Sequence, residues 1–192
     1  GIIHADASEE VQKLVEKNNL PTTMTLMGLG ILAPDNPLYM GMLGMHASRA
    51  TNMTMLESDL LIAVGVRFDD RATGKISEFC PNAKIIHMDI DPCEISKLKT
   101  AHIGLVGNVK DTLKLLLPHI KENSRKEWVN QNCKLQRQYP LFCQESYDPA
   151  KPYSIIMQAA EIAGENSIVT TDVGKHQMWT AQVYPFERPR QF

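Results

Sequence analysis

The chain has 192 residues, of which 43% are hydrophobic and 22% charged, and its formal net charge at pH 7 is −2. This composition excludes an intrinsically disordered chain, which combines low hydrophobicity with high net charge. The near-neutral charge gives no electrostatic signature of nucleic-acid or anionic-membrane binding, and apolar runs such as residues 60–66 are too short to span a bilayer. We therefore expect neither nucleic acid nor a membrane as a partner.

The cysteines indicate reduced thiols, as in a cytoplasmic protein. Four are present, with no CxxC pair: Cys80, Cys93, Cys133 and Cys143. Two of them lie near His87 and His102, but the spacing does not match the short paired spacings of structural zinc sites, so we set zinc aside. The chain lacks an initiator Met and a polar tail, and we expect it to be a piece of a longer protein.

The first elements are predicted from apolar runs and helix signals. An apolar run over 1–5 predicts a buried strand, and Asp6 or Ser8 is a candidate N-cap for a helix that closes at Asn18 and Asn19. Pro21 opens a second strand over 22–26. A segment without periodicity follows over 27–45, and a loop of that length in a compact domain is usually functional.

The middle of the chain alternates between helical and strand patterns. Helices are predicted over 49–57, 94–99 and 111–120, and strands over 60–66, 84–89 and 102–106. The strands are continuous apolar runs, which is typical of a parallel sheet buried on both faces. The fold class predicted for residues 1–120 is therefore α/β, doubly wound, with a mostly parallel sheet flanked by helices.

The composition becomes polar over 121–151, which predicts a linker containing one surface helix over 125–138. A second, truncated α/β unit is expected over 152–192. Its predicted elements are a helix over 153–163, a strand over 167–171 and a helix over 176–182.

Three candidate sites follow predicted strands, at the carboxyl edge where open α/β sheets bind ligands. In the loop over 65–71, Arg67 and Arg71 can neutralise a pyrophosphate, or they can pair with neighbouring aspartates in a solvated loop. Asp89 can hold a ribose hydroxyl, or it can belong to an Asp-Pro turn. The Gly- and Met-rich loop over 41–46 can contact an aromatic ring system, or it can be a packing loop. The chain contains neither GxGxxG nor a P-loop motif.

Five motifs together resemble the large catalytic subunits of the acetolactate synthase family of thiamine-diphosphate enzymes. The motifs are TLMGLG at 25–30, GMLGMH at 41–46, LLIAVGVRFDDR at 60–71, HMDIDP at 87–92 and DVGKHQMW at 172–179. The resemblance covers nearly the whole chain. It implies that residues 1–120 are the middle, FAD-binding domain of a three-domain enzyme and that residues 152–192 begin the thiamine-diphosphate domain.

The resemblance also implies a reaction and its cofactors. The family condenses two 2-ketoacids with release of CO2 in branched-chain amino-acid biosynthesis, using thiamine diphosphate and Mg²⁺, and its FAD undergoes no net redox change. Its members work in the cytoplasm as dimers or tetramers with a small regulatory subunit. The catalytic glutamate and the metal-binding motif of the family have no counterpart in these 192 residues, so this chain alone is expected to be inactive.

The family's functional positions carry over to particular residues. Predicted FAD contacts are Gly1, Thr25, Leu26, Met27, Gly44, Met45, His46, Gly65, Val66, Arg67, Asp69, Arg71, Asp89, Ile90, Ile95 and Asn108. Predicted substrate-channel residues are Met45, Asp70 and Arg71, and predicted thiamine-diphosphate contacts are Val173, Gly174 and His176. No metal ligand is predicted in the chain.

Three positions depart from the family pattern: Ala47 replaces a usual Gly, Asn108 a usual Asp, and Lys175 a common Gln. Two alternatives to acetolactate synthase stay open at this point. One is a sister thiamine-diphosphate enzyme such as a glyoxylate carboligase. The other is a non-catalytic module that binds ADP or NAD, which would need the arginines and Asp89 but no pocket for a flavin ring.

Overall fold

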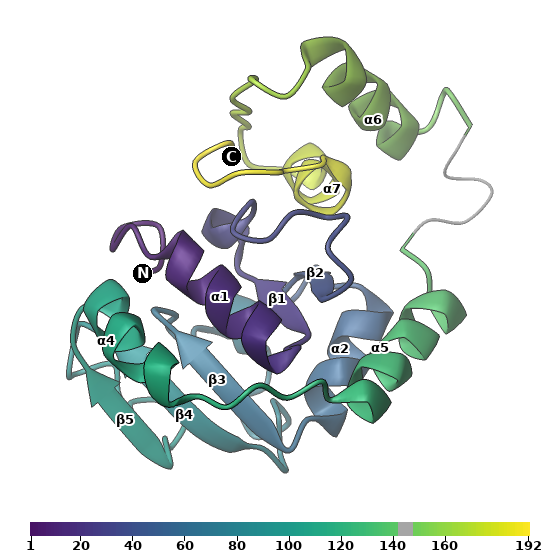
Figure 1. Ribbon diagram of the computed structural model, residues 1–192. Coiled ribbons are helices and arrows are strands. Elements are labelled where there is room, and N and C mark those ends of the chain that lie inside the picture. Colours follow the sequence, from purple (N-terminus) through teal and green to yellow (C-terminus); the bar gives the residue numbers. More distant parts are fainter. Residues whose placement is uncertain (142–147) are drawn as a thin grey trace.

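The computed structural model describes residues 1–141 and 148–192 (Figure 1). Cys143 and positions 145–147 of the expected linker lie outside the described residues. The strands form two parallel sheets. One contains β1 (Thr22–Met24) and β2 (Tyr39–Met42), and the other has the order β3 (Leu60–Val64), β4 (Lys84–Asp89) and β5 (Ile103–Val106). In the larger sheet Leu60 is aligned with Lys84, and Ile86 with Ile103. The predicted α/β class with parallel strands is confirmed.

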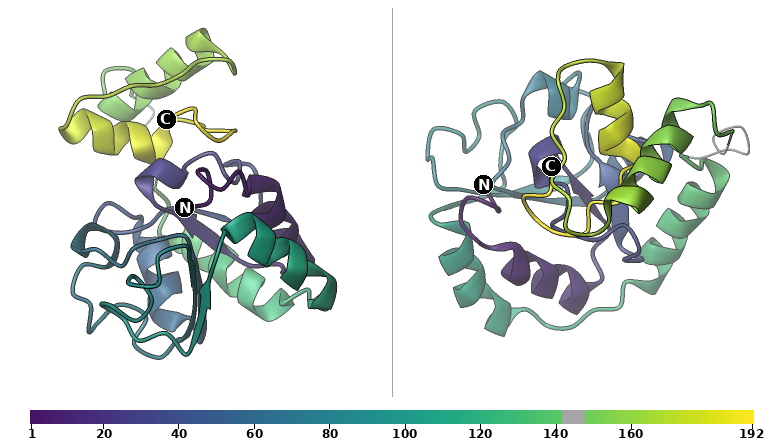
Figure 2. Two further views of the ribbon diagram at one scale, coloured as in Figure 1. Left: turned by 90° about the vertical axis from the view of Figure 1, so that its left-hand side faces the viewer. Right: turned by 90° about the horizontal axis from the view of Figure 1, so that it is seen from above.

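Helices surround these sheets (Figures 1 and 2). The α-helices are α1 (Ser8–Asn18), α2 (Arg49–Glu57), α3 (Asp70–Thr73), α4 (Val109–Leu116), α5 (Lys126–Gln138), α6 (Pro152–Ala163) and α7 (Lys175–Val183). Two single 3-10 turns are η1 (Leu26–Gly28) and η2 (Leu117–His119). Helix α1 packs beside α4, α2 beside α5, and α6 beside α7 at one end of the molecule.

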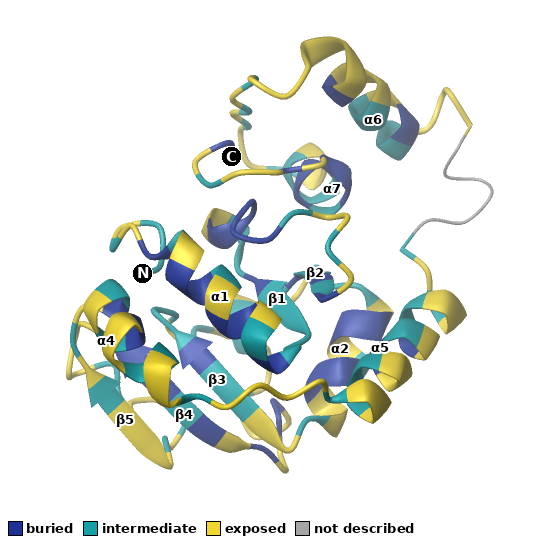
Figure 3. Cartoon of the chain, viewed as in Figure 1, coloured by how far each residue is buried: buried dark blue, intermediate teal, exposed yellow. Residues whose placement is uncertain are grey.

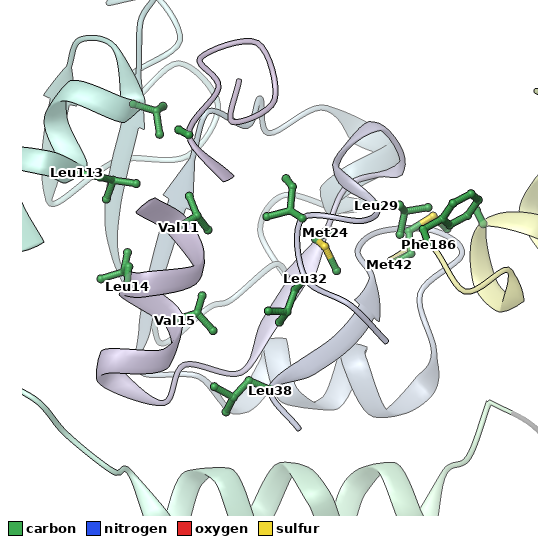
Figure 4. Packing of buried hydrophobic residues seen from close by; sticks show 14 of the residues in the cluster. Val11, Leu14, Val15, Met24, Leu29, Leu32, Leu38, Met42, Leu113 and Phe186 are labelled. Atoms are coloured by element: carbon green, nitrogen blue, oxygen red, sulfur yellow. The ribbon is translucent and has the colours of Figure 1, made fainter. Parts of the chain in front are cut away.

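Both faces of the larger sheet are covered, because alternate residues of its strands enter two different core clusters. Ile86 and Met88 belong with the cluster that contains Val11 and Leu14 of α1. Figure 4 shows Val11 and Leu14 on α1, and Figure 3 shows that β3 and β4 include buried residues. Ile85, also in β4, packs with Phe68 and Phe79 on the other face. This alternation explains why apolar residues occupy successive positions of β4, as at Ile85 and Ile86. Strand β5 is an exposed edge, where 52% of Ile103 is accessible to solvent.

The strand predicted over 1–5 is wrong. These residues form turns, in which the amide of Ala5 donates to the carbonyl of Gly1 over 2.9 Å and that of Ala7 donates to Ile2 over 3.1 Å. The predicted N-cap residues, Asp6 and Ser8, are also wrong, because Ala7 occupies the N-cap position of α1 and no side chain caps it, whereas the predicted end at Asn18 and Asn19 is confirmed. Asp6 instead accepts a hydrogen bond from Lys110 of α4, and this bond lowers the pKa of its carboxyl group.

Two further predicted elements are absent from the described chain. Residues 94–99 form turns rather than a helix, and Ser96 has a φ of +61°, a conformation that interrupts an α-helix. Residues 167–171 form no strand, because no neighbouring strand pairs with them. Within this segment, the amide of Val169 donates instead to the carbonyl of Gln191 over 2.8 Å.

The segment over 27–45 is not a single long loop, because it contains η1 and β2. Strand β2 was missed because its sequence, YMGM, lacks β-branched residues and contains Gly41. The predicted strand over 22–26 is shorter, ending at Met24, and the strand over 60–66 ends at Val64. The helix predicted over 49–57 and the strand over 84–89 are confirmed at both ends.

Candidate functional site

The carboxyl ends of the strands carry most of the predicted site residues. Thr25 to Met27 follow β1, Gly44 to His46 follow β2, and Gly65 to Arg67 follow β3. Asp89 ends β4, Ile90 follows it directly, and Asn108 lies two residues beyond β5. Parallel strands within a sheet end at a common edge, so each sheet presents its residues at one such edge.

Two backbone contacts join the loops of the two sheets. The amide of Met45, after β2, donates to the carbonyl of Arg71 in α3 over 2.9 Å. Gly44 has a φ of +100°, and a Cβ atom there would lie 2.2 Å from the same carbonyl oxygen. Only glycine permits this approach without strain. The structure thus brings the GMLGMH motif against the predicted substrate-channel residue Arg71.

A second close approach joins Gly1 to Gly65. A Cβ atom on Gly1 would lie 2.4 Å from the Cα atom of Gly65, whose own φ is +56°. Burial lowers the pKa of the Gly1 amino group; the charge of Asp89 opposes this shift and that of Arg67 adds to it. The first residue of the chain, the end of β3 and the end of β4 therefore meet at one place.

The two arginines of the loop after β3 are exposed, and no ion pair within residues 1–141 and 148–192 involves either of them. The solvated loop with internally paired Arg and Asp residues is therefore not what the structure describes. Asp69 accepts a hydrogen bond from the amide of Ala72 over 3.0 Å and caps α3. Asp70 is exposed in the first turn of that helix. Both guanidinium groups are accessible to an anionic ligand.

Exposed apolar side chains also lie at the carboxyl ends of the strands. Large hydrophobic residues follow or end four strands, with accessible fractions of 68% for Met27, 64% for Met45, 68% for Ile90 and 58% for Val106. Single exposed hydrophobics are ordinary, but a series of them along the carboxyl ends of strands indicates a surface that contacts another apolar group. The site therefore combines cationic and apolar surface.

The remaining predicted FAD residues have structural partners. Asn108 caps α4 by accepting from the amide of Lys110 over 2.9 Å. Ile95 packs on β5 so closely that a Cβ atom on Gly104 would lie 2.6 Å from its Cγ2 atom. Asp89 is buried and accepts from the amide of Asp91 over 3.0 Å. The carbonyl of Val66 is 3.0 Å from Nε2 of the buried His87.

The predicted thiamine-diphosphate residues lie in a separate segment, at the start of α7. Val173 is 81% accessible, His176 is exposed, and no side chain caps the helix after Gly174. Helix α7 contacts β2, and its Gln182 donates to the carbonyl of His46 over 2.8 Å. Sequence reasoning missed Gln182, because no pattern in the chain links it to a residue 136 positions away.

A family model described as thiamine pyrophosphate enzyme, central domain, matches residues 1–116. The chain belongs to this family. The match covers the two parallel sheets and α1 to α4. It therefore includes every residue predicted to contact FAD.

Several relatives of this chain are named acetolactate synthases, which confirms the resemblance. Over 192 residues it is 50% identical to the acetolactate synthase isozyme 1 large subunit of Escherichia coli strain K12, covering 100% of this chain and 34% of that protein. It is 40% identical to the isozyme 2 large subunit of the same organism, with 100% and 34% covered. It is also 40% identical to acetolactate synthase 1, chloroplastic, of Zea mays, with 98% and 30% covered.

The chain spans about a third of the length of these relatives. Within residues 1–141 and 148–192, no helix is long and apolar enough to cross a membrane.

Proposed function

We propose that the carboxyl edges of the two sheets form an FAD-binding site. The observation that carries this proposal is the combination at these edges of unpaired arginines, close glycine backbones and exposed apolar side chains, in a chain related to acetolactate synthases. Arg67 and Arg71 supply charge for the diphosphate, and Asp89 supplies a carboxylate for a ribose hydroxyl. Met27, Met45 and Ile90 supply apolar surface for the ring system.

Close backbone packing shapes the loops of the proposed FAD site. At Gly44 and Gly65 an added Cβ would collide with backbone atoms, so these loops keep their shape only with glycine. The remaining proposed contacts are Gly1, Thr25, Leu26, Gly44, His46, Gly65, Val66, Asp69, Ile95 and Asn108. A module for ADP or NAD would use the same charges and acid but would leave the methionines without a role.

The direct test is a titration of the chain with FAD, followed by flavin fluorescence, with ADP and NAD as competitors. We expect saturable binding that NAD does not displace. The variant Arg67→Gln should weaken binding about tenfold or more, since it removes one charge-assisted contact to the diphosphate. Lys84→Gln is the matched control, because Lys84 is an exposed cation at the opposite end of β4.

Each outcome has a separate meaning. Equal displacement by ADP, NAD and FAD would favour the generic nucleotide module. An effect of Lys84→Gln as large as that of Arg67→Gln would indicate non-specific electrostatic binding instead. Absence of FAD binding would contradict the proposed site in this chain.

For the full-length protein we propose acetolactate synthase activity, the condensation of two 2-ketoacids with release of CO2 in branched-chain amino-acid biosynthesis. Bound thiamine diphosphate, with its Mg²⁺, supplies the electron sink for decarboxylation. Met45, Asp70 and Arg71 would line the substrate channel, where the exposed guanidinium of Arg71 can orient a ketoacid carboxylate. Val173, Gly174 and His176 would contact thiamine diphosphate. The substrate preference separates this activity from that of a glyoxylate carboligase.

We propose a homo-oligomer with a small regulatory subunit as the assembly of the full-length enzyme, because several relatives are named large subunits. A cytoplasmic location accords with the reduced cysteines. Within this chain, the proposed limits are 1–120 for the FAD-binding domain, 121–151 for the linker and 152–192 for the start of the thiamine-diphosphate domain.

The 192 residues alone should consume no pyruvate in the presence of FAD, thiamine diphosphate and Mg²⁺. Thiamine-dependent turnover by this chain would contradict that prediction.

A further inference from the structure

A four-residue turn over 44–47 contains two of the proposed FAD contacts. The amide of Ala47 donates to the carbonyl of Gly44 over 2.9 Å, which places Met45 and His46 at the centre of the turn. Met45 is also a proposed substrate-channel residue. The conformation of this turn therefore determines where two proposed flavin contacts and one proposed substrate contact lie.

The turn is hydrogen-bonded from two sides. On one side, the amide of Met45 donates to the carbonyl of Arg71 in α3 over 2.9 Å. On the other side, Nε2 of Gln182 donates to the carbonyl of His46 over 2.8 Å. The first bond joins two backbone groups, whereas the second depends on the side chain of Gln182. A substitution at position 182 can therefore release one side of the turn and leave the other in place.

A second hydrogen bond orients the amide group of Gln182. The hydroxyl of Tyr153 in α6 donates to its Oε1 atom over 2.9 Å. Because a backbone carbonyl can only accept a hydrogen bond, Nε2 of Gln182 must face His46 and Oε1 must face Tyr153. The ring of Tyr153 lies edge-on to that of Trp179 in α7, with centroids 6.5 Å apart. The donor is thus oriented by its surroundings before any ligand binds.

Helix α7 connects this contact to the proposed thiamine-diphosphate residues. Gln182 is the next-to-last residue of α7, and His176 lies in its first turn. Their separation in sequence corresponds to about 9 Å along the helix axis. The helix contacts both α6 and β2, and Figure 1 shows it between them. One helix therefore carries a proposed thiamine contact near its amino end and the bond to the flavin turn near its carboxyl end.

We propose that Gln182 is a positioning residue, which holds the turn over 44–47 in the conformation that binds the flavin. The inference rests on the proposed FAD site, and it gives α7 a role in flavin binding. Gln182 is not itself a proposed FAD contact, because it acts through the backbone of His46. Without its hydrogen bond the turn is free to adopt other conformations, and the cofactor must order the turn when it binds, which lowers the affinity.

The test compares Gln182→Met with Gln136→Met in the 192-residue chain. Methionine is similar in length and uncharged, but it cannot donate a hydrogen bond. Gln136 is the matched control, because it is also half-buried and donates over 2.9 Å to the carbonyl of Tyr39, at the opposite end of β2. Urea denaturation should show similar losses of stability in both variants. We expect Gln182→Met to weaken FAD binding about tenfold and Gln136→Met to change it by less than about twofold.

Amide hydrogen exchange supplies a readout that needs no FAD. In Gln182→Met the amide of Met45 should exchange about tenfold faster, because its turn is then held on one side only. The amide of Thr22, which donates to Leu38 over 2.7 Å at the amino ends of β1 and β2, should not change. The variant Tyr153→Phe retains the donor of Gln182, so it should weaken FAD binding less than Gln182→Met does.

Unchanged FAD affinity in Gln182→Met would overturn the proposal, as would an equal loss in Gln136→Met, which would indicate a general effect of lower stability. Unchanged exchange at Met45 would overturn it as well. A greater loss of affinity in Tyr153→Phe would make Tyr153, and not Gln182, the group that holds the turn. Failure of the unaltered chain to bind FAD would contradict the flavin site itself, whereas the exchange of Met45 would still decide whether Gln182 holds the turn.

Discussion

Gly44 lies in the loop between β2 and α2, and its backbone has a left-handed conformation that other residues resist. Replacing it with alanine places a methyl group 2.2 Å from the carbonyl oxygen of Arg71, at a φ of +100°. We expect Gly44→Ala to lower the free energy of unfolding by about 1–3 kcal/mol and to abolish FAD binding, because both loops must move. Urea denaturation and the flavin titration measure the two effects.

Gly41→Ala is the matched control for this substitution. Gly41 has a similar φ of +82°, but a Cβ atom there would meet nothing within 4 Å. The variant Gly41→Ala should therefore lose free energy of unfolding through its backbone conformation alone, without a collision, and FAD binding should persist. Equal loss of binding in both variants would mean that backbone strain in β2, and not the contact with Arg71, controls the site.

The reactivity of the cysteines tests the burial of the core cluster that contains Phe68, Phe79 and Cys80. Burial raises the pKa of the Cys80 thiol, which is 1% accessible, whereas Cys93 is exposed. Because the thiolate is the reactive form, a maleimide at pH 7 should label Cys93 rapidly and Cys80 only after unfolding. Peptide mapping by mass spectrometry distinguishes the two positions. Rapid labelling of Cys80 in the native protein would show that the cluster around Phe79 opens readily.

Residue types at the ends of strands could be predicted from the sequence, but their partners could not. The arginines, Asp89 and the glycine loops were proposed from their position after predicted strands, at the edge where open α/β sheets bind ligands. That Asp69 caps α3 and Asn108 caps α4 depends on where these helices begin. Gln182 reaches His46 only through the packing of α7 on β2, which no local pattern encodes.

At the scale of elements, α2 and α5 are held together by a buried polar pair. The hydroxyl of Thr54 donates to Asn132, whose own amide group donates to the carbonyl of Trp128 over 2.7 Å. Both residues are buried. Thr54→Val should cost about 1–3 kcal/mol of unfolding free energy, since it leaves the buried side-chain oxygen of Asn132 without its donor. Asn132→Leu should cost less from this source, because the Thr54 hydroxyl keeps its bond to the carbonyl of Ala50 over 3.0 Å.

The double variant Thr54→Val/Asn132→Leu distinguishes loss of the hydrogen bond between the two side chains from loss of their packing contacts. Removing both polar groups leaves neither unpaired, so its cost should fall at least about 0.5 kcal/mol short of the sum of the single costs. Urea denaturation of the four proteins completes the cycle. Additive costs would mean that the two side chains act independently and that α5 is held by its apolar contacts alone.

Elements with strong local signals were predicted well, whereas elements that depend on a partner were not. The helix over 49–57 has Ser48 as a side-chain cap, and β4 contains the apolar residues Ile85, Ile86 and Met88. The runs over 1–5 and 167–171 also contain β-branched residues, but a strand forms only beside another strand, and neither run has one among the described residues. Strand β2 shows the converse, because pairing with β1 stabilises a sequence with little strand propensity.

For the whole molecule, the C-terminal segment belongs to the same hydrophobic core as the sheets. Phe186 packs with Leu29 and Met42 (Figure 4), and Tyr184 and Ala181 join the same cluster. A Cβ atom on Gly30 would lie 2.0 Å from the carbonyl oxygen of Arg188, so the two backbones are in direct contact. The arrangement predicts that residues 148–192 stabilise the part of the chain that precedes them, even where they begin a different domain of the full-length enzyme.

A chain that ends at residue 141 tests this dependence. Leu29 and Ile31, which are 2% and 3% accessible, would lose their cover, and each fully buried side chain of this kind contributes about 1.5–3 kcal/mol. We expect the melting temperature to fall by several degrees, since about 1 kcal/mol corresponds to roughly 2–4 °C in a chain of this size. Phe186→Ala in the 192-residue chain should reproduce much of the decrease. An unchanged melting temperature for the shorter chain would mean that the sheets fold independently of α6 and α7, as the boundary near residue 151 implies for a self-sufficient middle domain.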